Sequence, residues 1–395
     1  MNSNEWVKKS WGELATLEYG KSLTGYRELK GQIPVFGTNG KIGYTEKPLC
    51  DKPGIIIGRK GAYRGVHFSK EPFYVIDTAF YLKPKKNIEL NLIYAYYQLL
   101  TQNINEMDSG SAIPSTSRED FYNLNLLLPP LKSQEKIAHI LSSLDEKIEL
   151  NIQTNQTLEE LARTIFKEWF VNLNYPNNND TGRKHSEFGE IPTNWEILGI
   201  GEVCYVQNGY AFKSNDFKEE GEVGIIKIKN INSNVVDIEK TDFVDANVVE
   251  RLDKKFKIES GSLLIAMTGA EVGKIGLVPL TEKNLWLNQR VGMFKEKIAY
   301  GNLFMYLLLS SDTYQTNIQN SALGSAQPNI SASAIESIRA IIPTAELIEA
   351  FGKMVHPMFE KILDNLAENE TLKITRDSLL PKLMSGEIDV NISNA

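Results

Sequence analysis

The residues with the clearest capacity for chemistry form a basic and aromatic loop. It runs from Arg59 to Gly65 with the sequence Arg-Lys-Gly-Ala-Tyr-Arg-Gly, and a histidine follows two residues later. Guanidinium and ammonium groups donate hydrogen bonds to guanine edges and to phosphates. Glycines allow a ligand to approach the backbone closely. The candidate nucleic-acid contacts here are Arg59, Lys60, Tyr63, Arg64 and His67.

A second candidate segment lies in the other half of the chain, where Asn288, Gln289 and Arg290 are consecutive. Amide side chains pair with adenine as arginine pairs with guanine. Polar turns supply further candidates, namely Lys41, Tyr44, Ser115, Thr116, Ser117, Arg118, Thr268, Lys274, Gln327 and Asn329, with Asn208, Tyr210 and Lys213 as weaker ones. For Arg59 and Arg290, an ion pair with a surface carboxylate stays open as the alternative.

Motifs for catalysis or metal binding do not match. The segment from Gly269 to Lys274 has three residues between its glycines and Ile275 after the lysine, so it is not a phosphate-binding loop. The sequence Leu-Pro-Pro-Leu at 128–131 lacks the asparagine and the aromatic residue with which DNA amino-methyltransferases grip a flipped base. Four histidines are scattered, and the two cysteines lack metal-ligand spacing. We therefore expect a non-catalytic chain with no metal site and no disulfide.

Length and composition indicate an ordinary globular protein with more than one core. The chain has 395 residues, of which 42% are hydrophobic and 24% are charged. No apolar run approaches the roughly 20 residues needed to span a bilayer. The first residues lack the pattern of a secretory signal. With so few cysteines, these features predict a cytoplasmic protein with no membrane partner.

The net charge of −7, taken alone, disfavours nucleic acid as a partner. The charge is unevenly spread, however. Residues 1–130 carry a small excess of basic side chains, and residues 189–343 a small excess of acidic ones. Any nucleic-acid-binding face must therefore be local, with modest affinity for phosphates when the chain is alone.

The chain repeats itself. The sequence Gly-Ser-Ala-Ile-Pro at 110–114 recurs as Gly-Ser-Ala-Gln-Pro at 324–328, a shift of 214 residues. The opening segments 6–23 and 195–212 correspond at a smaller shift of 189, so insertions fall in the loops between them. Two similar globules follow from this pattern. Whether the Gly-Ser-Ala signature contacts a ligand or only shapes a turn stays open.

Each globule is predicted to combine short strands with an amphipathic helix. The strands are expected at 55–57, 73–76, 79–82, 124–128 and 263–265, and the helices at 90–100 and 304–309. Between the globules lies a polar and aperiodic stretch. The predicted parts are a first domain at 1–130, a long helix at 131–170, a linker at 171–188, a second domain at 189–343, a second long helix at 344–384 and a tail at 385–395.

Two heptad-patterned segments follow the globules. Seam residues step by fours and threes from Ile137 to Ile165 and again from Phe351 to Leu379. Each helix of about 38 residues extends roughly 57 Å. An isolated helix would leave its apolar seam in water, so the two should pair.

The linker favours an antiparallel pair, because some 18 residues would have to be almost fully extended to retrace a helix. That pairing brings Asn151 and Asn155 opposite Asn365 and Asn369, where polar seam residues can specify register. In the alternative, these side chains face solvent. The predicted fold is α+β, with two similar domains joined by two long helices in an antiparallel, pseudo-two-fold coiled coil. Such a rod would space the two domains by more than one turn of DNA.

At this point the chain resembles the specificity (S) subunits of type I restriction–modification enzymes over essentially its full length. The segments 6–20 and 195–209 are similar to the openings of that family's target-recognition domains, and 189–195 to the entry into its second one. The segment 128–137 is similar to the entry into its first conserved helix, and 379–388 to its carboxyl terminus. The second copy departs at Pro343-Thr344-Ala345-Glu346, which lacks the second proline and the glutamine.

The resemblance implies a DNA-recognition chain without catalysis of its own. Each target-recognition domain would read one half of a split, double-stranded DNA site. The paired helices would set the gap and dock two methyltransferase (M) subunits, which would carry S-adenosylmethionine. Separate restriction motor-nuclease (R) subunits would cleave unmodified DNA.

Two rival functions remain for comparison. A self-sufficient methyltransferase or nuclease would need a cofactor or metal motif, and none is found. A coiled-coil scaffold whose globules bind proteins is compatible with the acidic net charge.

Overall fold

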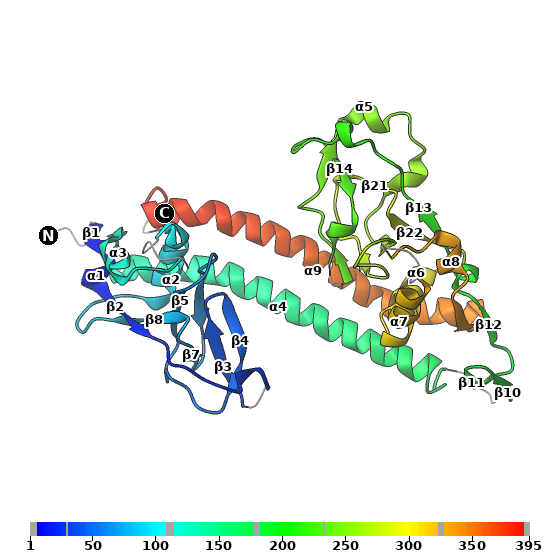
Figure 1. Cartoon of the computed structure of the whole chain (residues 1–395), viewed down its shortest axis with the longest axis horizontal. Helices are drawn as coiled ribbons and strands as arrows, with labels where there is room; N and C mark the ends of the chain where they lie inside the picture. Colours follow the sequence, from blue (N-terminus) through cyan, green and yellow to red (C-terminus); the bar gives the residue numbers. More distant parts are fainter. Residues whose placement is uncertain are drawn as a thin grey trace, which may run out of the picture. The chain divides into compact units, whose positions relative to one another are not determined.

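The computed structural model describes residues 6–28, 31–107, 114–176, 182–232, 234–322 and 328–390. The chain divides into two compact units (Figure 1). The first unit is Met1–Ile148 with Thr371–Ala395, and the second unit is Glu149–Glu370. Helices and sheets both contribute to each unit, so the fold class is α+β. No helix among the described residues is long and apolar enough to cross a membrane.

Short sheets build the first unit, and their strand pairs are antiparallel except for one parallel pair in the smaller sheet. The main sheet has the order β2-β8-β5-β6, with the strands Ala15–Tyr19, Ala79–Pro84, Gly54–Gly58 and Val66–Ser69. A smaller sheet has the order β4-β3-β7, with the strands Gly40–Thr45, Ile33–Gly37 and Tyr74–Val75. Strand β1 (Val7–Ser10) pairs with β9 (Asn125–Leu128) and closes the unit. The expected strands at 55–57, 79–82 and 124–128 are confirmed, whereas the one expected at 73–76 is reduced to its two central residues.

The first unit also contains helices, some of which pack against its sheets. They are α1 (Trp11–Leu14), α2 (Leu92–Leu100), α3 (Arg118–Asn123), the 3-10 turns Tyr26–Glu28 and Ile104–Glu106, the first part of α4 (Leu131–Phe170) and the last part of α9 (Ala345–Ser385). Asn91 caps α2 by accepting hydrogen bonds from the second and third amides of the helix. The core centres on Trp11, which is fully buried and packs 5.8 Å from Phe121 between ring centroids.

The second unit repeats this plan with more strands. One sheet has the order β13-β22-β19-β20-β16-β15, with the strands Cys204–Asn208, Val291–Glu296, Leu263–Ala266, Ile275–Leu277, Asn234–Val236 and Ile231–Asn232. The other has the order β17-β14-β21-β18, with the strands Asp242–Val244, Val223–Ile226, Asn284–Leu287 and Lys257–Ile258. Strand β12 (Glu196–Gly199) pairs with β23 (Arg339–Ile342), as β1 does with β9.

Helices of the second unit include a segment that the sequence did not indicate. They are the second part of α4, α5 (Ala246–Val249), α6 (Gly301–Leu309), α7 (Asp312–Ser321), α8 (Ala332–Glu336), the 3-10 turns Ile200–Glu202, Ser214–Asp216, Ile228–Asn230 and Lys254–Phe256, and most of α9 (Ala345–Ser385). Helix α7 is polar except for Ile318, which is fully buried, so its apolar signal is too weak for a sequence-based prediction. Strand β10 (Arg183–Ser186), in the segment expected to be linker, pairs with β11 (Gly189–Pro192) at the start of the expected second domain, across a hairpin turn.

The two long helices contact each other within each unit. In the first unit, Leu141 of α4 shares an apolar cluster with Leu383 of α9, and Arg376 donates to Asp145 at 2.6 Å. In the second unit, Ala162 and Phe170 of α4 share a cluster with Phe351 of α9. In both units, later residues of α4 contact earlier residues of α9, so the two helices are antiparallel. Burying these apolar seams supplies the driving force for the pairing.

Candidate nucleic-acid interface

In the first unit, the basic loop after β5 lies against the strand-like segment before α3. We call this contact the loop crossing. The Gly61 amide donates to the Pro114 carbonyl at 3.0 Å, and the Thr116 amide donates to the Arg59 carbonyl at 2.8 Å. The Thr38 hydroxyl braces the crossing by donating to the Lys60 carbonyl at 2.8 Å. The backbone of this loop is therefore held by hydrogen bonds on both sides.

The same crossing recurs in the second unit after β19. The Gly269 amide donates to the Pro328 carbonyl at 2.8 Å, and the Ile330 amide donates to the Met267 carbonyl at 2.9 Å. Thr268 and Asn329 form a bridge that corresponds to the bridge between Lys60 and Ser115. The two crossings thus share one backbone design, and this design places Pro114 to Arg118 and Pro328 to Ser331 beside the loops that follow β5 and β19.

A close backbone contact also recurs beside each crossing. A Cβ on Gly20 would lie 2.1 Å from the Ile76 carbonyl oxygen, and a Cβ on Gly209 would lie 2.1 Å from the Asn288 carbonyl oxygen. Only glycine fits such an approach. Gly20 and Gly209 were expected to correspond from the sequence repeat, and the close carbonyl oxygen explains why both positions hold glycine.

Arg59 stacks on aromatic rings at the surface of the first unit. Its guanidinium carbon lies 4.7 Å from the ring centroid of Tyr19 and 5.7 Å from that of Phe80. One guanidinium N–H donates to the Asp77 carbonyl at 3.0 Å. The alternative of an ion pair with a surface carboxylate is not seen for Arg59 among the described residues. The ring contacts and this hydrogen bond restrict the movement of the guanidinium group.

Arg118 approaches the same ring from helix α3. Its guanidinium carbon lies 5.2 Å from the Tyr19 centroid and 5.9 Å from that of Tyr122. Ser117 caps this helix, because its hydroxyl accepts from the Asp120 amide. Tyr19 is 47% exposed, so the stacked group is open to solvent. Sequence reasoning missed Tyr19, although its position beside Gly20 was a usable signal.

The other basic candidates of the first unit are also at the surface. Lys60 is exposed and Tyr63 is 77% exposed at the tip of the loop. The Lys41 ammonium donates to the Tyr44 hydroxyl at 2.9 Å and lies 5.0 Å from its ring centroid. His67 is partly buried, and desolvation lowers its pKa below the usual value despite a contact with the Thr38 carbonyl.

Arg64 has a different place from the one that its sequence context suggested. It is only 2% exposed, and its guanidinium donates to the carbonyls of Gly61, Ile104, Asn105 and Met107. Arginine adopts such a site when buried carbonyls need donors. With its side chain occupied in this way, Arg64 has no free face for a base or a phosphate. Thr116 is similarly buried, and its hydroxyl donates to the Gly58 carbonyl at 2.9 Å.

The polar candidates of the second unit line the turn between β21 and β22. Gln289 and Arg290 are exposed, and the Asn288 side chain accepts a long hydrogen bond from the Arg290 amide. The Met267 amide donates to the Arg290 carbonyl at 3.0 Å, so this turn abuts the loop crossing. Asn329 is exposed on the other side of the crossing. These four residues therefore come together around one crossing.

Two remaining candidates of the second unit are less available for contact with a ligand. Lys274 forms an ion pair with Glu271, and the Thr268 hydroxyl is buried without a partner among the described residues. Gln327 lies outside the described residues, as do 110–113 and 324–326 of the Gly-Ser-Ala signature. The signature's choice between contact and turn therefore stays open.

The four seam asparagines lie in the second unit and pair across α4 and α9. The Asn151 amide donates to Asn369 at 2.9 Å, and the Asn365 amide donates to Asn155 at 2.8 Å. Asn151, Asn365 and Asn369 are no more than 4% exposed. The alternative in which these three side chains face solvent is therefore wrong.

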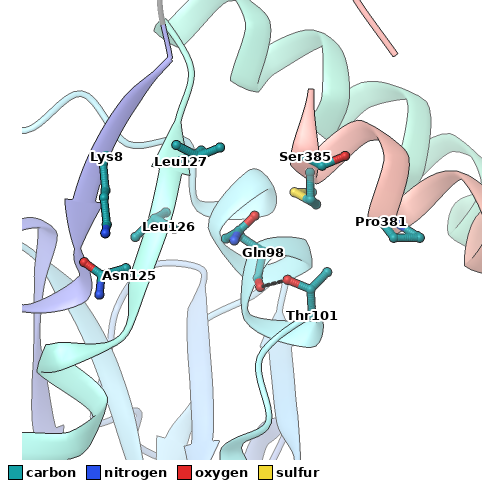
Figure 2. A pocket seen from close by; sticks show the side chains of 9 residues that line it. Lys8, Gln98, Thr101, Asn125, Leu126, Leu127, Pro381 and Ser385 are labelled. Carbon is teal, nitrogen blue, oxygen red and sulfur yellow. Dashed lines mark hydrogen bonds between the residues drawn. The ribbon is translucent and has the colours of Figure 1, made fainter. Parts of the chain in front are cut away.

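The first unit also has a cavity of about 350 Å³. Figure 2 shows the side chains that line it. The residues that line it include Gln98 of α2, Thr101 directly after that helix, Leu127 of β9, and Pro381 and Ser385 of α9. None of the candidate contacts lines it. Among the described residues, no group of His, Cys, Asp and Glu could hold a metal ion. The arrangement offers donors for hydrogen bonds and stacking, which is the chemistry of recognition.

Comparison with known proteins gives this arrangement a context. The family model described as "Type I restriction modification DNA specificity domain" matches residues 3–160 and 192–368. The two matches cover both copies of the sequence repeat and most of both long helices.

Individual relatives match over most of their own length. The MjaIX type I restriction enzyme specificity subunit of Methanocaldococcus jannaschii is 25% identical over 97% of this chain and 89% of the relative. The HindI specificity subunit of Haemophilus influenzae is 26% identical over 93% of this chain and 90% of the relative. A crystal structure of the type I restriction–modification S subunit from M. genitalium has a similar fold, with a TM-score of 0.67 at 21% identity and 97% coverage of both chains.

Proposed function

Because the chain belongs to the type I restriction–modification DNA specificity family, we propose that each of its two units reads one half of a bipartite DNA site. The family makes this chain the non-catalytic DNA-recognition component of a restriction–modification system. The division of labour between the two units and the residues involved belong to the proposal.

The observation that carries the proposal is the duplicated loop crossing with different side chains. Arg59 and Lys60 surround the crossing of the first unit, and Gln289, Arg290 and Asn329 surround that of the second. Two scaffolds of one design that present different hydrogen-bonding groups suit two different half-sites. Base edges are distinguished by this kind of donor and acceptor pattern.

The proposed contacts of the first unit are the exposed or partly exposed candidates of its loops. They are Lys41, Tyr44, Arg59, Lys60, Tyr63, His67, Ser115 and Ser117. Those of the second unit are Asn288, Gln289, Arg290 and Asn329, with Lys274 and Thr268 in secondary roles because of their burial or ion pairing. Gln327 remains a sequence-based candidate.

We further propose that α4 and α9 form an antiparallel coiled coil that sets the gap between half-sites. The paired asparagines support this, because a buried amide pair is lost if one helix slides by a heptad past the other. The partners in the proposal are double-stranded DNA, two M subunits that bring S-adenosylmethionine, and R subunits. The helical pair is the proposed dock for the M subunits.

The test uses the chain in complex with its M subunits and maps methylated sites across a genome. A two-part motif with a fixed gap supports the proposal. Arg290→Ala should relax discrimination at one base of one half-site by about 1–3 kcal/mol. Loss of equal size on all sequences would make Arg290 a phosphate contact. Binding without any sequence preference would favour the protein-binding scaffold instead.

A matched deletion tests whether the paired helices set the gap between the half-sites. Residues 152–158 of α4 and 362–368 of α9 lie opposite each other, because Asn155 pairs with Asn365 between them. Removing both heptads keeps the Asn151–Asn369 pair and shortens the helices by about 10 Å, which equals about three base pairs of DNA. We expect the tolerated gap to shrink by that amount. An unchanged gap in a folded, active complex would remove this role of the helices from the proposal.

A further inference from the structure

Two arginines share one exposed tyrosine ring in the first unit, and the described part of the second unit holds no such group at the corresponding place. We propose that Arg59 recognises a guanine in the half-site read by the first unit and that Arg118 binds a neighbouring phosphate. The inference rests on the proposed function, since it names the base that one recognition loop reads.

The geometry prepares Arg59 for a planar ligand. Its guanidinium is stacked on Tyr19 and Phe80, and its contact with the Asp77 carbonyl uses one donor. The guanidinium carries five N–H groups in a fixed planar fork, and the two ring contacts and the hydrogen bond to Asp77 restrict how that fork can turn. Guanine offers two acceptors, O6 and N7, that match two donors of such a fork. Holding the fork in place before binding reduces the entropy lost on binding.

The charge of the cluster also indicates an anionic ligand. Both guanidinium carbons lie within 5.2 Å of the Tyr19 centroid, and neither arginine has a carboxylate partner among the described residues. Two positive charges gathered around one ring repel one another. A DNA backbone beside a guanine supplies the compensating negative charge.

The two arginines differ in how they are held, and this difference assigns their roles. Arg59 is partly buried and has a backbone hydrogen bond. Arg118 is exposed on the first residue of α3, with ring contacts on Tyr19 and Tyr122. A fixed fork suits a base edge, whereas an exposed cation that can adjust suits a phosphate.

The corresponding positions of the second unit carry other residues. In the β2–β8 ladder Tyr19 pairs with Phe80, and in the corresponding β13–β22 ladder Asn208 pairs with Gly292. At the crossing, Met267 stands where Arg59 stands. At the start of α8, Ala332 follows its capping serine as Arg118 follows Ser117. Recognition of guanine through this cluster is therefore specific to the first unit.

The experiment is a selection of bound duplexes by the full chain in complex with its M subunits. The probe is a DNA library with both half-sites randomised around the native gap. We expect one guanine to be preferred at least tenfold in the half-site of the first unit. Arg59→Lys and Arg59→Gln should both abolish that preference and leave the other half-site unchanged, since a point charge cannot bond two acceptors as a fork does.

Arg118 should behave differently. Arg118→Gln should weaken binding to all sequences alike and reduce the slope of affinity against salt concentration by about one, whereas Arg118→Lys should keep both close to the wild type. Tyr19→Phe keeps the ring and should keep the guanine preference, whereas Tyr19→Ala should reduce it. Arg339→Gln serves as the charge control, because Arg339 is ion-paired with Glu187 in the second unit.

The outcomes separate the inference from the function on which it rests. A bipartite motif that Arg59→Gln leaves intact, or a first half-site without guanine, overturns the inference alone. A complex that selects no bipartite motif at all overturns the proposed function. Folding of each variant is checked by its thermal transition, and the conservative Arg59→Lys variant keeps the test valid if Arg59→Gln fails to fold.

Discussion

The two loop crossings share a backbone and differ in nearly every side chain that reaches solvent. In both, a glycine amide bonds to the carbonyl of the proline that ends the Gly-Ser-Ala repeat. Around them, the first unit gathers arginines on a tyrosine ring, while the second exposes Gln289 and Arg290 on the neighbouring turn. The backbone bonds that hold each loop do not depend on these side chains, so recognition can change without loss of the fold.

One buried position within the loop also keeps its structural role in both units while the residue type changes. Arg64 fills its site by bonding four carbonyls, and Val272 fills the corresponding site as a buried apolar residue. Both solutions close the loop against the core. At this position the two units share a buried side chain but not the residue type.

The largest expected effect tests the shared backbone. Gly20→Ala and Gly209→Ala should each destabilise their unit by more than about 3 kcal/mol, because the new Cβ would meet a carbonyl oxygen at 2.1 Å. Chemical denaturation followed by intrinsic fluorescence measures both. Gly37→Ala is the control, since its Cβ would meet only side-chain atoms, the nearest at 3.2 Å. Equal tolerance of all three substitutions would contradict a close backbone contact at Gly20 and Gly209.

The next effect tests the two solutions at the buried position. Arg64→Val should cost about 2–3 kcal/mol of unfolding free energy, because it leaves buried carbonyls without donors. Val272→Ala should cost about 1 kcal/mol. The same variants should keep the base preferences of the complex. A change of base preference in Arg64→Val without loss of stability would return Arg64 to the DNA interface.

A smaller effect compares how each domain is fastened to α4. The Tyr97 hydroxyl donates to Asp145 at 2.5 Å and the Tyr306 hydroxyl donates to Glu159 at 2.8 Å. Burial and these carboxylates raise the pKa of both phenols. Tyr97→Phe and Tyr306→Phe should each lower the unfolding free energy by about 1–2 kcal/mol. If only one variant is destabilised, the fastenings are not equivalent.

The smallest effect concerns pH and is confined to the first unit, where His67 faces the Thr38 carbonyl and His67 corresponds to Ile275 in the second unit. Burial lowers the pKa of His67 in the folded state, so the unfolded chain takes up a proton more readily. The stabilising contribution of neutral His67 is therefore present above about pH 6.5 and declines as the pH falls below it. His67→Gln should flatten that part of the pH dependence of unfolding, and an unchanged profile would contradict the assignment.

Much of the fold could be predicted from the sequence because its signals are local. The strand at 55–57 is a run of isoleucine between glycines, and it forms β5. The helix expected at 304–309 is present but begins at Gly301, since Tyr300 adopts a left-handed conformation with φ of 61° just before it. Helix α7 and the β17-β14-β21-β18 sheet lack such local signals and arise from packing over long sequence distances.

The candidate site was less predictable than the fold. Residue type suggested that Arg64 contacts a ligand, yet burial turned its donors inward. Tyr19 attracts little notice in the sequence, yet two arginines from distant segments meet on its ring. The signal for Arg64 lay in the repeat itself, because a shift of 208 residues places it on Val272, an apolar residue that favours burial.

Periodicity and repetition along the chain were sufficient to establish duplicated domains, two long heptad helices and a family resemblance, because each is recognised by comparing segments of sequence without knowing which residues meet in space. Which cationic side chains stay exposed for the proposed DNA contacts was decided only by the tertiary structure. A guanidinium has the same chemistry wherever it lies, and whether it bonds a buried carbonyl, as Arg64 does, or rests on an exposed ring, as Arg59 does, depends on segments that meet only after folding.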